Sequence, residues 1–302
     1  MKYRALGKTG VKVSVISVGT HQFSGEWAQS FSAPEVAAML DRARELGINL
    51  LDTAECYGDH AVEALVGEAI QKNRGDWLIA TKFGHAYLDG SPKKSEAWTA
   101  AQVQKQLEDS LKALRTDRID LYQFHSGTNK DFENEELWTM LNAQVRAGKI
   151  RFLGVSLSAD VLLKDDLKQL HAATRVGASV IQVVYNRLQR KAEETVLPYC
   201  ERENLGVLVR VALAKGFLSG NYKPGAVFSK DDTRSTYSQQ FNDGQLRLVE
   251  EIKAREVPPG QNMAQWALAW CLKQKAVSSV IAGCKNVKQL EANAVAADVS
   301  PL

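Results

Sequence analysis

The chain of 302 residues lacks the features that mark several classes of protein. It has only four cysteines, and because they are far apart with no CxxC spacing, neither a zinc site nor a disulfide framework is predicted. No apolar run approaches the roughly 18 residues needed to span a bilayer, and the N-terminus does not lead into the apolar core of a signal peptide. We therefore expect a cytoplasmic protein with reduced thiols that binds no membrane. The cysteines are Cys56, Cys200, Cys271 and Cys284.

An excess of charge of one sign is also missing. The chain has 38 lysines and arginines against 35 acidic residues, a net charge of +3, and the basic residues are dispersed rather than gathered in a stripe. This balance argues against a nucleic-acid partner. The phosphate-binding signatures GxGxxG and GxxxxGK are absent too, which argues against a doubly wound dinucleotide-binding sheet.

Short apolar segments alternate with helix-like segments through most of the chain. The apolar segments are rich in Val, Ile and Leu, as the strands of a buried parallel sheet must be. Eight such units in about 290 residues predict an α/β fold of the closed (β/α)₈ TIM-barrel type, in one domain over residues 1–302. A β-hairpin around Gly7–Gly10 is predicted to precede it. We expect the strands near 13–18, 49–52, 77–81, 119–124, 150–155, 179–184, 206–211 and 278–281.

Helices are predicted between these strands from periodicity and from start and stop signals. Ser32 is the expected N-cap of the first helix, and Gly47 the expected residue after its end. The long connection 214–240 is rich in turn residues and is expected to form a functional lid. The expected helices cover 35–46, 60–72, 99–114, 134–147, 160–173, 191–203, 241–255, 261–273 and 287–297.

Four ionisable residues follow the ends of successive predicted strands, where the active site of a (β/α)₈ barrel lies. They are Asp52, Tyr57, Lys82 and His125. Together they form an acid–base set able to polarise and protonate a carbonyl group. Tyr57 would give the proton, and the Lys82 ammonium, held by Asp52, would lower the pKa of the phenol. His125 would donate a hydrogen bond to the oxygen that becomes negative.

Each of the four also has an ordinary structural explanation. Asp52 could cap a turn and Tyr57 could be a turn aromatic beside Gly58. Lys82 could be a solvated loop lysine, and His125 a core histidine. Their common position on one rim of one barrel favours the catalytic interpretation.

Several segments of the chain resemble the aldo-keto reductase superfamily in combination, along nearly the whole length. The similar segments are residues 3–14, 51–58 (Leu-Asp-Thr-Ala, then Tyr-Gly), 79–82 (Ile-Ala-Thr-Lys), 120–125 (Asp-Leu-Tyr-Gln-Phe-His) and 148–156. The resemblance implies Asp52, Tyr57, Lys82 and His125 as a catalytic tetrad. It also implies hydride transfer between a nicotinamide and a carbonyl carbon, with Tyr57 as general acid.

The same resemblance implies a nicotinamide cofactor, expected to be NADPH/NADP⁺. Ser156 and Gln182 match positions that hold the carboxamide, and Arg210 stands where an aromatic residue usually stacks on the nicotinamide ring. Lys285 near the start of the last helix, joined by Arg234 from the lid loop, is read as the 2′-phosphate site. Departures from the family pattern are Leu157, Val211-Ala212, Asn221 and Ala282. The expected cofactor-binding residues are Gly19, Thr20, Asp52, Ser156, Gln182, Arg210, Val211, Leu213, Gly216, Arg234, Gly283, Lys285, Gln289 and Asn293.

The substrate is expected to be a small polar, sugar-like or aryl aldehyde. The chain resembles short bacterial members, which lack the long C-terminal loop of the steroid-reducing branch. The expected substrate pocket consists of Phe23, Trp27, Tyr57, Tyr87, His125 and Ser126, with no metal and no obligate protein partner.

Three alternatives compete with an aldehyde reductase. One is a sugar (aldose) dehydrogenase working in the oxidative direction, and another is a nicotinamide-binding regulatory subunit of the potassium-channel β type, which would keep the same four residues. The third is a metal-dependent barrel hydrolase. It is weak because His125 is the only histidine at the predicted strand ends and the carboxylates do not cluster.

Overall fold

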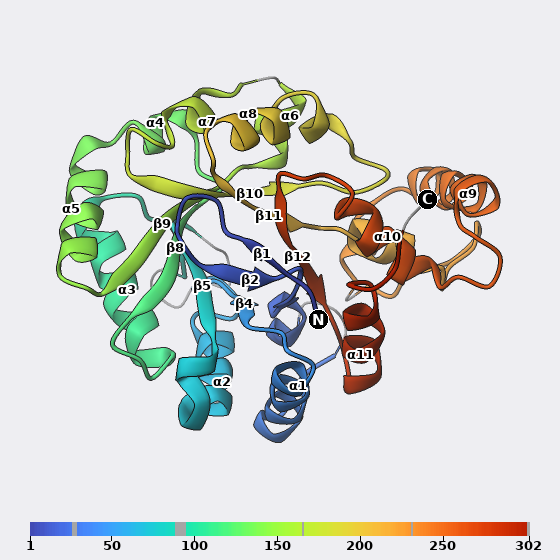
Figure 1. The fold of residues 1–302 in the computed structure, drawn as a ribbon, viewed down its shortest axis with the longest axis horizontal. Helices are drawn as coiled ribbons and strands as arrows, with labels where there is room; N and C mark the ends of the chain where they lie inside the picture. The colour runs from blue at the N-terminus through green and yellow to red at the C-terminus, as the bar shows by residue number, and fades with distance from the viewer. Residues whose placement is uncertain (26–28, 88–94, 165, 231, 301–302) are drawn as a thin grey trace.

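A closed barrel of parallel strands forms the centre of the computed structural model, which describes residues 1–25, 29–87, 95–164, 166–230 and 232–300 (Figure 1). The order around the barrel is β3-β4-β5-β8-β9-β10-β11-β12, and β12 pairs with β3 to close it. This confirms the predicted (β/α)₈ fold. The strands are β3 (Ile16–Gly19), β4 (Leu50–Asp52), β5 (Leu78–Phe83), β8 (Ile119–His125), β9 (Ile150–Ser156), β10 (Ala178–Val184), β11 (Gly206–Arg210) and β12 (Val277–Gly283).

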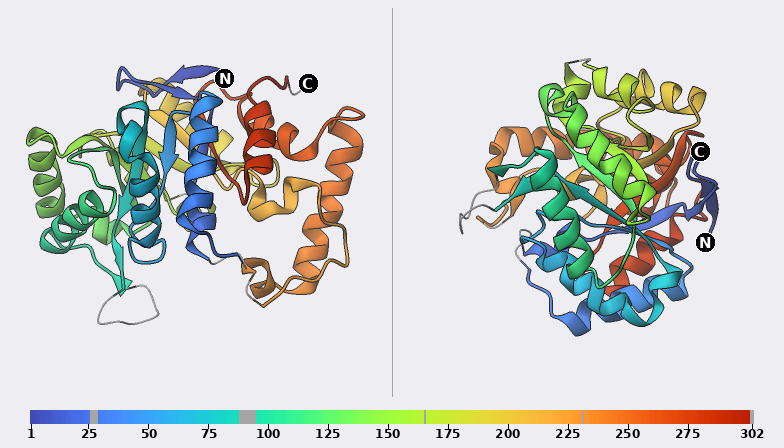
Figure 2. Two further views of the ribbon diagram at one scale, coloured as in Figure 1. Left: turned by 90° about the horizontal axis from the view of Figure 1, so that it is seen from below. Right: turned by 90° about the vertical axis from the view of Figure 1, so that its left-hand side faces the viewer.

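An antiparallel hairpin of β1 (Tyr3–Ala5) and β2 (Lys12–Ser14) lies across one end of the barrel (Figures 1 and 2). The predicted strand 13–18 was wrong at its start, because Val13 belongs to this hairpin and the barrel strand begins at Ile16. Val13 is fully buried, so its apolar side chain serves the hairpin as well as it would serve a barrel strand. The Arg4 guanidinium fastens the hairpin by donating to the carbonyls of Leu272, Gln274 and Val277.

Apolar side chains fill the interior of the barrel at the end that the hairpin covers. Leu6 and Val13 of the hairpin form one cluster with a residue from each of six strands, so this half of the barrel is a packed core. The polar side chains of the strands therefore gather at the opposite end. The strand residues of the cluster are Leu50, Ala80, Leu121, Val180, Leu208 and Ile281.

Helices surround the barrel, and most begin and end within a few residues of the predicted bounds (Figure 2). Ser32 caps the first helix with a capping box, and Gly47 follows its end with a positive φ, as predicted. The helices are α1 (Ala33–Glu45), α2 (Ala61–Ile70), α3 (Ala100–Ala113), α4 (Asn129–Phe132), α5 (Glu135–Arg146), α6 (Ala159–Leu163), α7 (Lys168–Ala172), α8 (Val196–Arg202), α9 (Gln239–Glu256), α10 (Met263–Cys271) and α11 (Val287–Val295).

Two predicted helices differ from the structure. The helix expected over 160–173 is divided into α6 and α7, and between them Asp166 accepts a hydrogen bond from Asn129. The helix expected from 191 begins only at Val196, since Pro198 is tolerated in the first turn of a helix but not in its interior. A short 3₁₀ turn, η3 (Lys191–Glu193), precedes it.

The connections at the polar end contain short elements of their own. A small hairpin, β6 (His85–Ala86) with β7 (Ser95–Glu96), follows β5, and η1 (His21–Ser24) follows β3. The long connection 214–240 contains the 3₁₀ turns η4 (Ala214–Ser219) and η5 (Thr233–Thr236). η2 (Gln71–Asp76) extends α2 at the other end of the barrel. None of the helices in the described part of the chain is long and apolar enough to cross a bilayer.

Candidate active site

A buried ion pair joins two neighbouring strands at the polar end of the barrel. The Lys82 Nζ atom lies 2.8 Å from Asp52 Oδ1 and 2.6 Å from the carbonyl oxygen of Thr53. It also lies 3.4 Å from the Tyr57 hydroxyl. Lys82 and Asp52 are both buried, so the ammonium has three oxygen partners and little contact with water. Such an arrangement offsets the cost of burying the two charges.

Tyr57 reaches this pair from the turn after β4. Three successive residues with positive φ, from Gly58 to His60, reverse the chain there and lead into α2. Burial raises the pKa of the Tyr57 hydroxyl to about 12, and the Lys82 charge lowers it only in part. The Lys82 charge acts in the expected direction and lowers this pKa, but desolvation of the phenolate is the larger effect, so the net shift is upward. At neutral pH Tyr57 keeps its proton, as a general acid must.

The electrostatics of Lys82 favour its charged form. Burial alone would lower the pKa of this ammonium, but the opposing charge of Asp52 and the Tyr57 hydroxyl outweigh it, and the pKa is raised. The group is thus a permanent cation beside the phenol.

Aromatic and imidazole rings surround the Tyr57 side chain. His125, at the end of β8, meets the Tyr57 ring edge-on with 6.4 Å between centroids. His21, from η1, lies closer, at 4.6 Å. His85, at the start of β6, places its Nε2 atom 2.8 Å from the carbonyl oxygen of His125. The sequence reasoning missed His21 and His85, although both come within three residues of a strand end.

Amide side chains hold the second oxygen of Asp52. Gln182, on β10, donates to Asp52 Oδ2 at 2.7 Å, and Gln123, on β8, does so at 3.4 Å. Ser156, at the end of β9, lies 3.5 Å from the Gln182 amide oxygen. Ser156 and Gln182 were predicted to bind a carboxamide, and they lie together in the polar layer next to Asp52. The role of Gln123 was not foreseen.

Arg210 ends β11 and is half-buried. One of its nitrogens donates to the carbonyl oxygen of Leu157, while Nε is buried and has no partner among the described residues. Burial lowers the pKa of this group, and the charges of Tyr57 and Asp52 act in the opposite direction, which places Arg210 in the field of the same site.

Several residues in the connection after β11 have a positive φ. Val211, Ala214 and Lys215 have φ between 48° and 59°, and Gly216 has φ of 90°. Positive φ at a β-branched residue is rare and strained, and such strain gathers at ligand-binding positions. The Asn186 side chain supports it by donating to the carbonyl oxygen of Val211. The predicted cofactor residues Val211 and Gly216 flank this segment, with Leu213 between them.

Arg234 is not a surface cation. Its guanidinium is 5% exposed, pairs with Asp232 at 2.6 Å and stacks against the rings of Tyr222 and Phe228. The hydrogen bond from Arg234 is the main reason why the pKa of Asp232 is lowered. Arg234 therefore links η5 to Tyr222 and Phe228, which lie earlier in the same connection, and a phosphate-binding role for Arg234 stays a prediction.

The predicted adenosine-side residues cluster at the end of β12 and the start of α11. The Gln289 side chain accepts a hydrogen bond from the Lys285 backbone amide, and Asn293 donates to the carbonyl oxygen of Gly283. Gly283 pairs with Gly19 of β3. The hydroxyl of Thr20 donates to the carbonyl oxygen of Asp52 and so links this corner to the ion pair.

The predicted substrate-pocket residues divide into two groups. Tyr87 is 3.4 Å from the carbonyl oxygen of Cys56, and the Ser126 backbone amide donates to Ser156, so both lie beside Tyr57 and His125. Phe23 is 4% exposed and packs against Phe31, within the apolar core. Trp27 lies outside the described residues.

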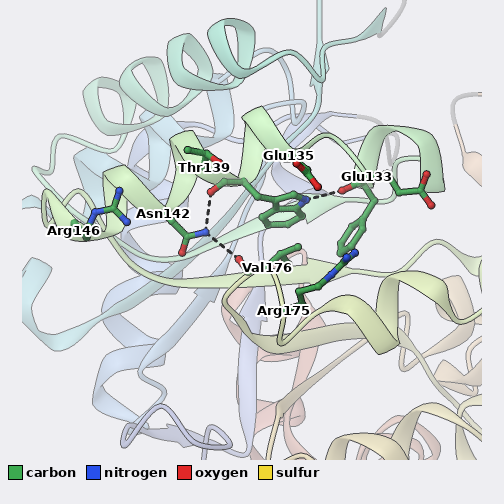
Figure 3. Close-up of a pocket in the computed structure, with 9 residues that line it drawn as sticks. Glu133, Glu135, Thr139, Asn142, Arg146, Arg175 and Val176 are labelled. Carbon is green, nitrogen blue, oxygen red and sulfur yellow. Dashed lines mark hydrogen bonds between the residues drawn. The ribbon is translucent and has the colours of Figure 1, made fainter.

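A depression of about 670 Å³ lies elsewhere, along α5 on the outside of the barrel (Figure 3). Trp138 is one of the lining residues and donates to the carbonyl oxygen of Phe132, while Asn142 donates to that of Val176. These two polar groups are already paired within the protein, and the charged residues that line the depression are Glu133, Glu135, Arg146 and Arg175. None of the four predicted acid–base residues is among its lining residues.

The chain is similar to known proteins over its full length. The sequence profile of the Aldo/keto reductase family matches residues 15–302. The uncharacterized oxidoreductase YqkF of Bacillus subtilis is 33% identical over 100% of this chain and 93% of its own. A probable voltage-gated potassium channel subunit beta of Arabidopsis thaliana is 29% identical over the same shares.

Among solved structures, the glycerol dehydrogenase AKR11B4 from Gluconobacter oxydans superposes with a TM-score of 0.83. The two are 28% identical over 97% of this chain and 89% of the other. With the barrel and the full-length profile match, these relatives establish that the chain belongs to the aldo/keto reductase family of nicotinamide-dependent oxidoreductases.

Proposed function

We propose that this protein reduces a small polar, sugar-like or aryl aldehyde to the alcohol with NADPH, with Tyr57 as general acid. One observation carries the proposal: a buried, permanently charged Lys82 faces the hydroxyl of Tyr57 at 3.4 Å. Tyr57 keeps its proton at neutral pH, and a cation at its oxygen stabilises the negative charge that develops there as the proton leaves.

Each residue of the tetrad has a separate part in the reaction. A reduced nicotinamide, when bound, supplies the hydride that is added to the carbonyl carbon. Tyr57 donates its proton to the carbonyl oxygen, and Lys82 stabilises the negative charge left on the phenol. Asp52 holds the ammonium in place, and His125 orients the carbonyl by donating a hydrogen bond. The proton returns to Tyr57 from water after the alcohol leaves.

The side chains at the strand ends suit a nicotinamide. Its carboxamide needs donors and acceptors, which Ser156 and Gln182 offer, and its ring needs a flat neighbour, which Arg210 offers. The unpartnered Nε atom of Arg210 is a buried donor that a ligand would satisfy. Val211, Leu213 and Gly216 would follow the pyrophosphate, and Lys285, Gln289 and Asn293 would hold the adenosine end.

Replacing Arg210 with glutamine tests its place beside the nicotinamide ring. A cation there disfavours the positively charged oxidised ring, so the wild type is expected to bind NADPH more tightly than NADP⁺. Arg210→Gln should bring the two dissociation constants closer by roughly tenfold, about 1.4 kcal/mol. Fluorescence titration with each nucleotide measures both. Equal affinities for the two redox states in the wild type would count against the assignment.

Replacing Lys285 with alanine tests the 2′-phosphate site. The variant should lose about tenfold or more in affinity for NADPH, because a phosphate loses a charged partner, while NADH binding stays unchanged. Titrating both nucleotides into both proteins separates the phosphate from the rest of the cofactor. Lys288 lies in the first turn of α11, three residues after Lys285, and is exposed, so Lys288→Ala serves as the matched control. Equal binding of NADH and NADPH by the wild type would contradict the 2′-phosphate site but would leave the proposal of a reductase unchanged.

A second candidate function is a nicotinamide-binding regulatory subunit, and the likeness to a plant potassium-channel subunit supports it. An intact tetrad does not separate it from an enzyme. Multiple turnovers with an aldehyde panel, and no stable partner on pull-down, would favour the enzyme. The similarity to a glycerol dehydrogenase keeps the oxidative direction open, and assays with NADP⁺ and sugar or polyol substrates test it.

A further inference from the structure

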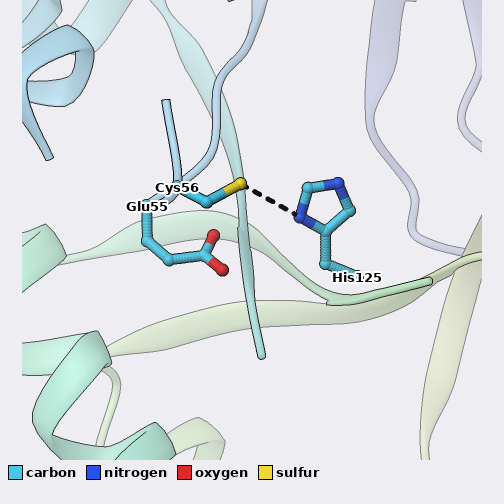
Figure 4. A group of neighbouring side chains, drawn as sticks. All are labelled: Glu55, Cys56 and His125. Carbon is cyan, nitrogen blue, oxygen red and sulfur yellow. Dashed lines mark hydrogen bonds between the residues drawn. The ribbon is translucent and has the colours of Figure 1, made fainter. Parts of the chain in front are cut away.

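Three metal-binding side chains converge beside Tyr57, and the proposed reaction does not use two of them. They are Glu55, Cys56 and His125, and one potential ligand atom from each lies within 4.8 Å of the others (Figure 4). We propose that they form a three-ligand site for a borderline-soft divalent cation such as Zn²⁺. We further propose that loading this site inhibits carbonyl reduction.

The sulfur and nitrogen atoms already lie at a suitable separation. Cys56 Sγ is 3.7 Å from His125 Nδ1. A tetrahedral zinc ion with bonds of about 2.3 Å to sulfur and about 2.0 Å to nitrogen places these two atoms about 3.5 Å apart. Cys56 and His125 therefore need only small movements to bind one ion, with loss of the thiol proton.

The Glu55 carboxylate provides a second, independent observation, because one of its oxygens has no hydrogen-bond partner among the described residues. Its side chain is 2% exposed, and one carboxylate oxygen accepts a hydrogen bond from the His85 backbone amide at 3.0 Å. The other oxygen, Oε2, is buried and has no partner among the described residues. An orphaned buried carboxylate oxygen is costly, and a cation would offset that cost.

The ligand set points to zinc rather than to magnesium or calcium. One thiolate, one imidazole and one carboxylate are the ligand types of zinc sites, whereas Mg²⁺ and Ca²⁺ take oxygen atoms. Three protein ligands leave a fourth position for water. The ligands come from the turn after β4 and the end of β8, so an ion would join two segments that carry tetrad residues.

Inhibition follows from the movement that binding requires, and this part rests on the proposed function. Cys56 and His125 already lie 3.7 Å apart, so the separations that must close from as much as 4.8 Å to about 3.5 Å are those of the Glu55 carboxylate, which belongs to the turn that carries Tyr57. A misplacement of about 1 Å between groups that act together costs on the order of 100-fold in rate. Carbonyl reduction should therefore fall sharply when one equivalent of Zn²⁺ is bound.

Cobalt spectroscopy tests the site without any assay of activity. Nucleotide-free protein is titrated with Co²⁺, and we expect one ion per chain with a thiolate-to-cobalt absorption in the near ultraviolet, displaced by one equivalent of Zn²⁺. Cys56→Ser should abolish the absorption and weaken Zn²⁺ binding by on the order of 10- to 100-fold or more. Glu55→Gln should keep the absorption but weaken Zn²⁺ binding. Cys200→Ala removes an equally buried thiol far from the site and should change neither.

The outcomes separate the metal site from the proposed function. No cobalt–thiolate absorption in the wild type, or an absorption that survives Cys56→Ser with an unchanged circular dichroism spectrum, would overturn the site. If no aldehyde is reduced by the metal-free protein, the proposed function fails while the cobalt titration still decides the site. If aldehydes are reduced equally well with and without bound Zn²⁺, the site stands and its inhibitory role is wrong.

Discussion

Tyr57→Phe is expected to lower the turnover number for aldehyde reduction by about 10²- to 10⁴-fold, because general acid catalysis by one positioned group contributes on that scale. The affinity for NADPH should stay nearly unchanged, since the hydroxyl acts mainly in the transition state. The change removes one oxygen that faces Lys82 at 3.4 Å and leaves the ring between His21 and His125 in place. Steady-state kinetics and nucleotide titration on the same preparation measure the two effects.

Tyr122→Phe provides the matched control for this experiment. Tyr122 is fully buried on β8, and its hydroxyl has no hydrogen-bond partner among the described residues. The same chemical change at that position should leave turnover within about twofold of the wild type, because it touches neither the ion pair nor the strand ends. Turnover by Tyr57→Phe at the wild-type rate would mean that another group is the acid.

The ends of the barrel strands were predictable because two local signals agree there. A short run of Val, Ile and Leu indicates a buried parallel strand, and the first polar residue after it must lie at the rim. Pairing of β4 with β5 and of β5 with β8 then brings Asp52, Lys82 and His125 to one side of the barrel. The register of the strands thus turns three distant sequence positions into neighbours.

Other features depend on distances that no sequence pattern encodes. The pKa of Tyr57 is decided by the balance between burial and the Lys82 charge, and burial is a property of the assembled site. Glu55 and Cys56 lie inside the motif that identified Asp52 and Tyr57, yet only the folded turn brings them beside His125. Arg234 was expected to join the 2′-phosphate site from the lid loop, and only the fold of the connection after β11 shows that Asp232 and two aromatic rings enclose it.

Asp52→Asn is expected to destabilise the protein by about 3 to 5 kcal/mol, since removing one partner of a buried ion pair leaves the other charge uncompensated. Lys82 is 1% exposed and would keep only the carbonyl oxygen of Thr53 and the phenol as partners. The asparagine still offers an oxygen to Gln182, so the hydrogen bonds between the amide side chains are preserved. The loss of unfolding free energy then measures the effect of removing the Asp52 charge. The shift of the urea midpoint at constant slope measures it. A midpoint equal to that of the wild type would show that the pair is not a buried salt bridge in solution.

Adding Lys82→Met to Asp52→Asn tests whether the ion pair is required for the stability of the fold or for carbonyl reduction. The double variant removes both charges of the pair, and with them the ammonium that bound the carbonyl oxygen of Thr53. Replacing both members of a buried ion pair is often neutral or stabilising, so its urea midpoint should return to near the wild-type value. Carbonyl reduction should stay lost, because nothing then stabilises the charge that develops on Tyr57. A stable, inactive double variant would show that the fold does not require this ion pair and that the pair is present for its effect on the phenol.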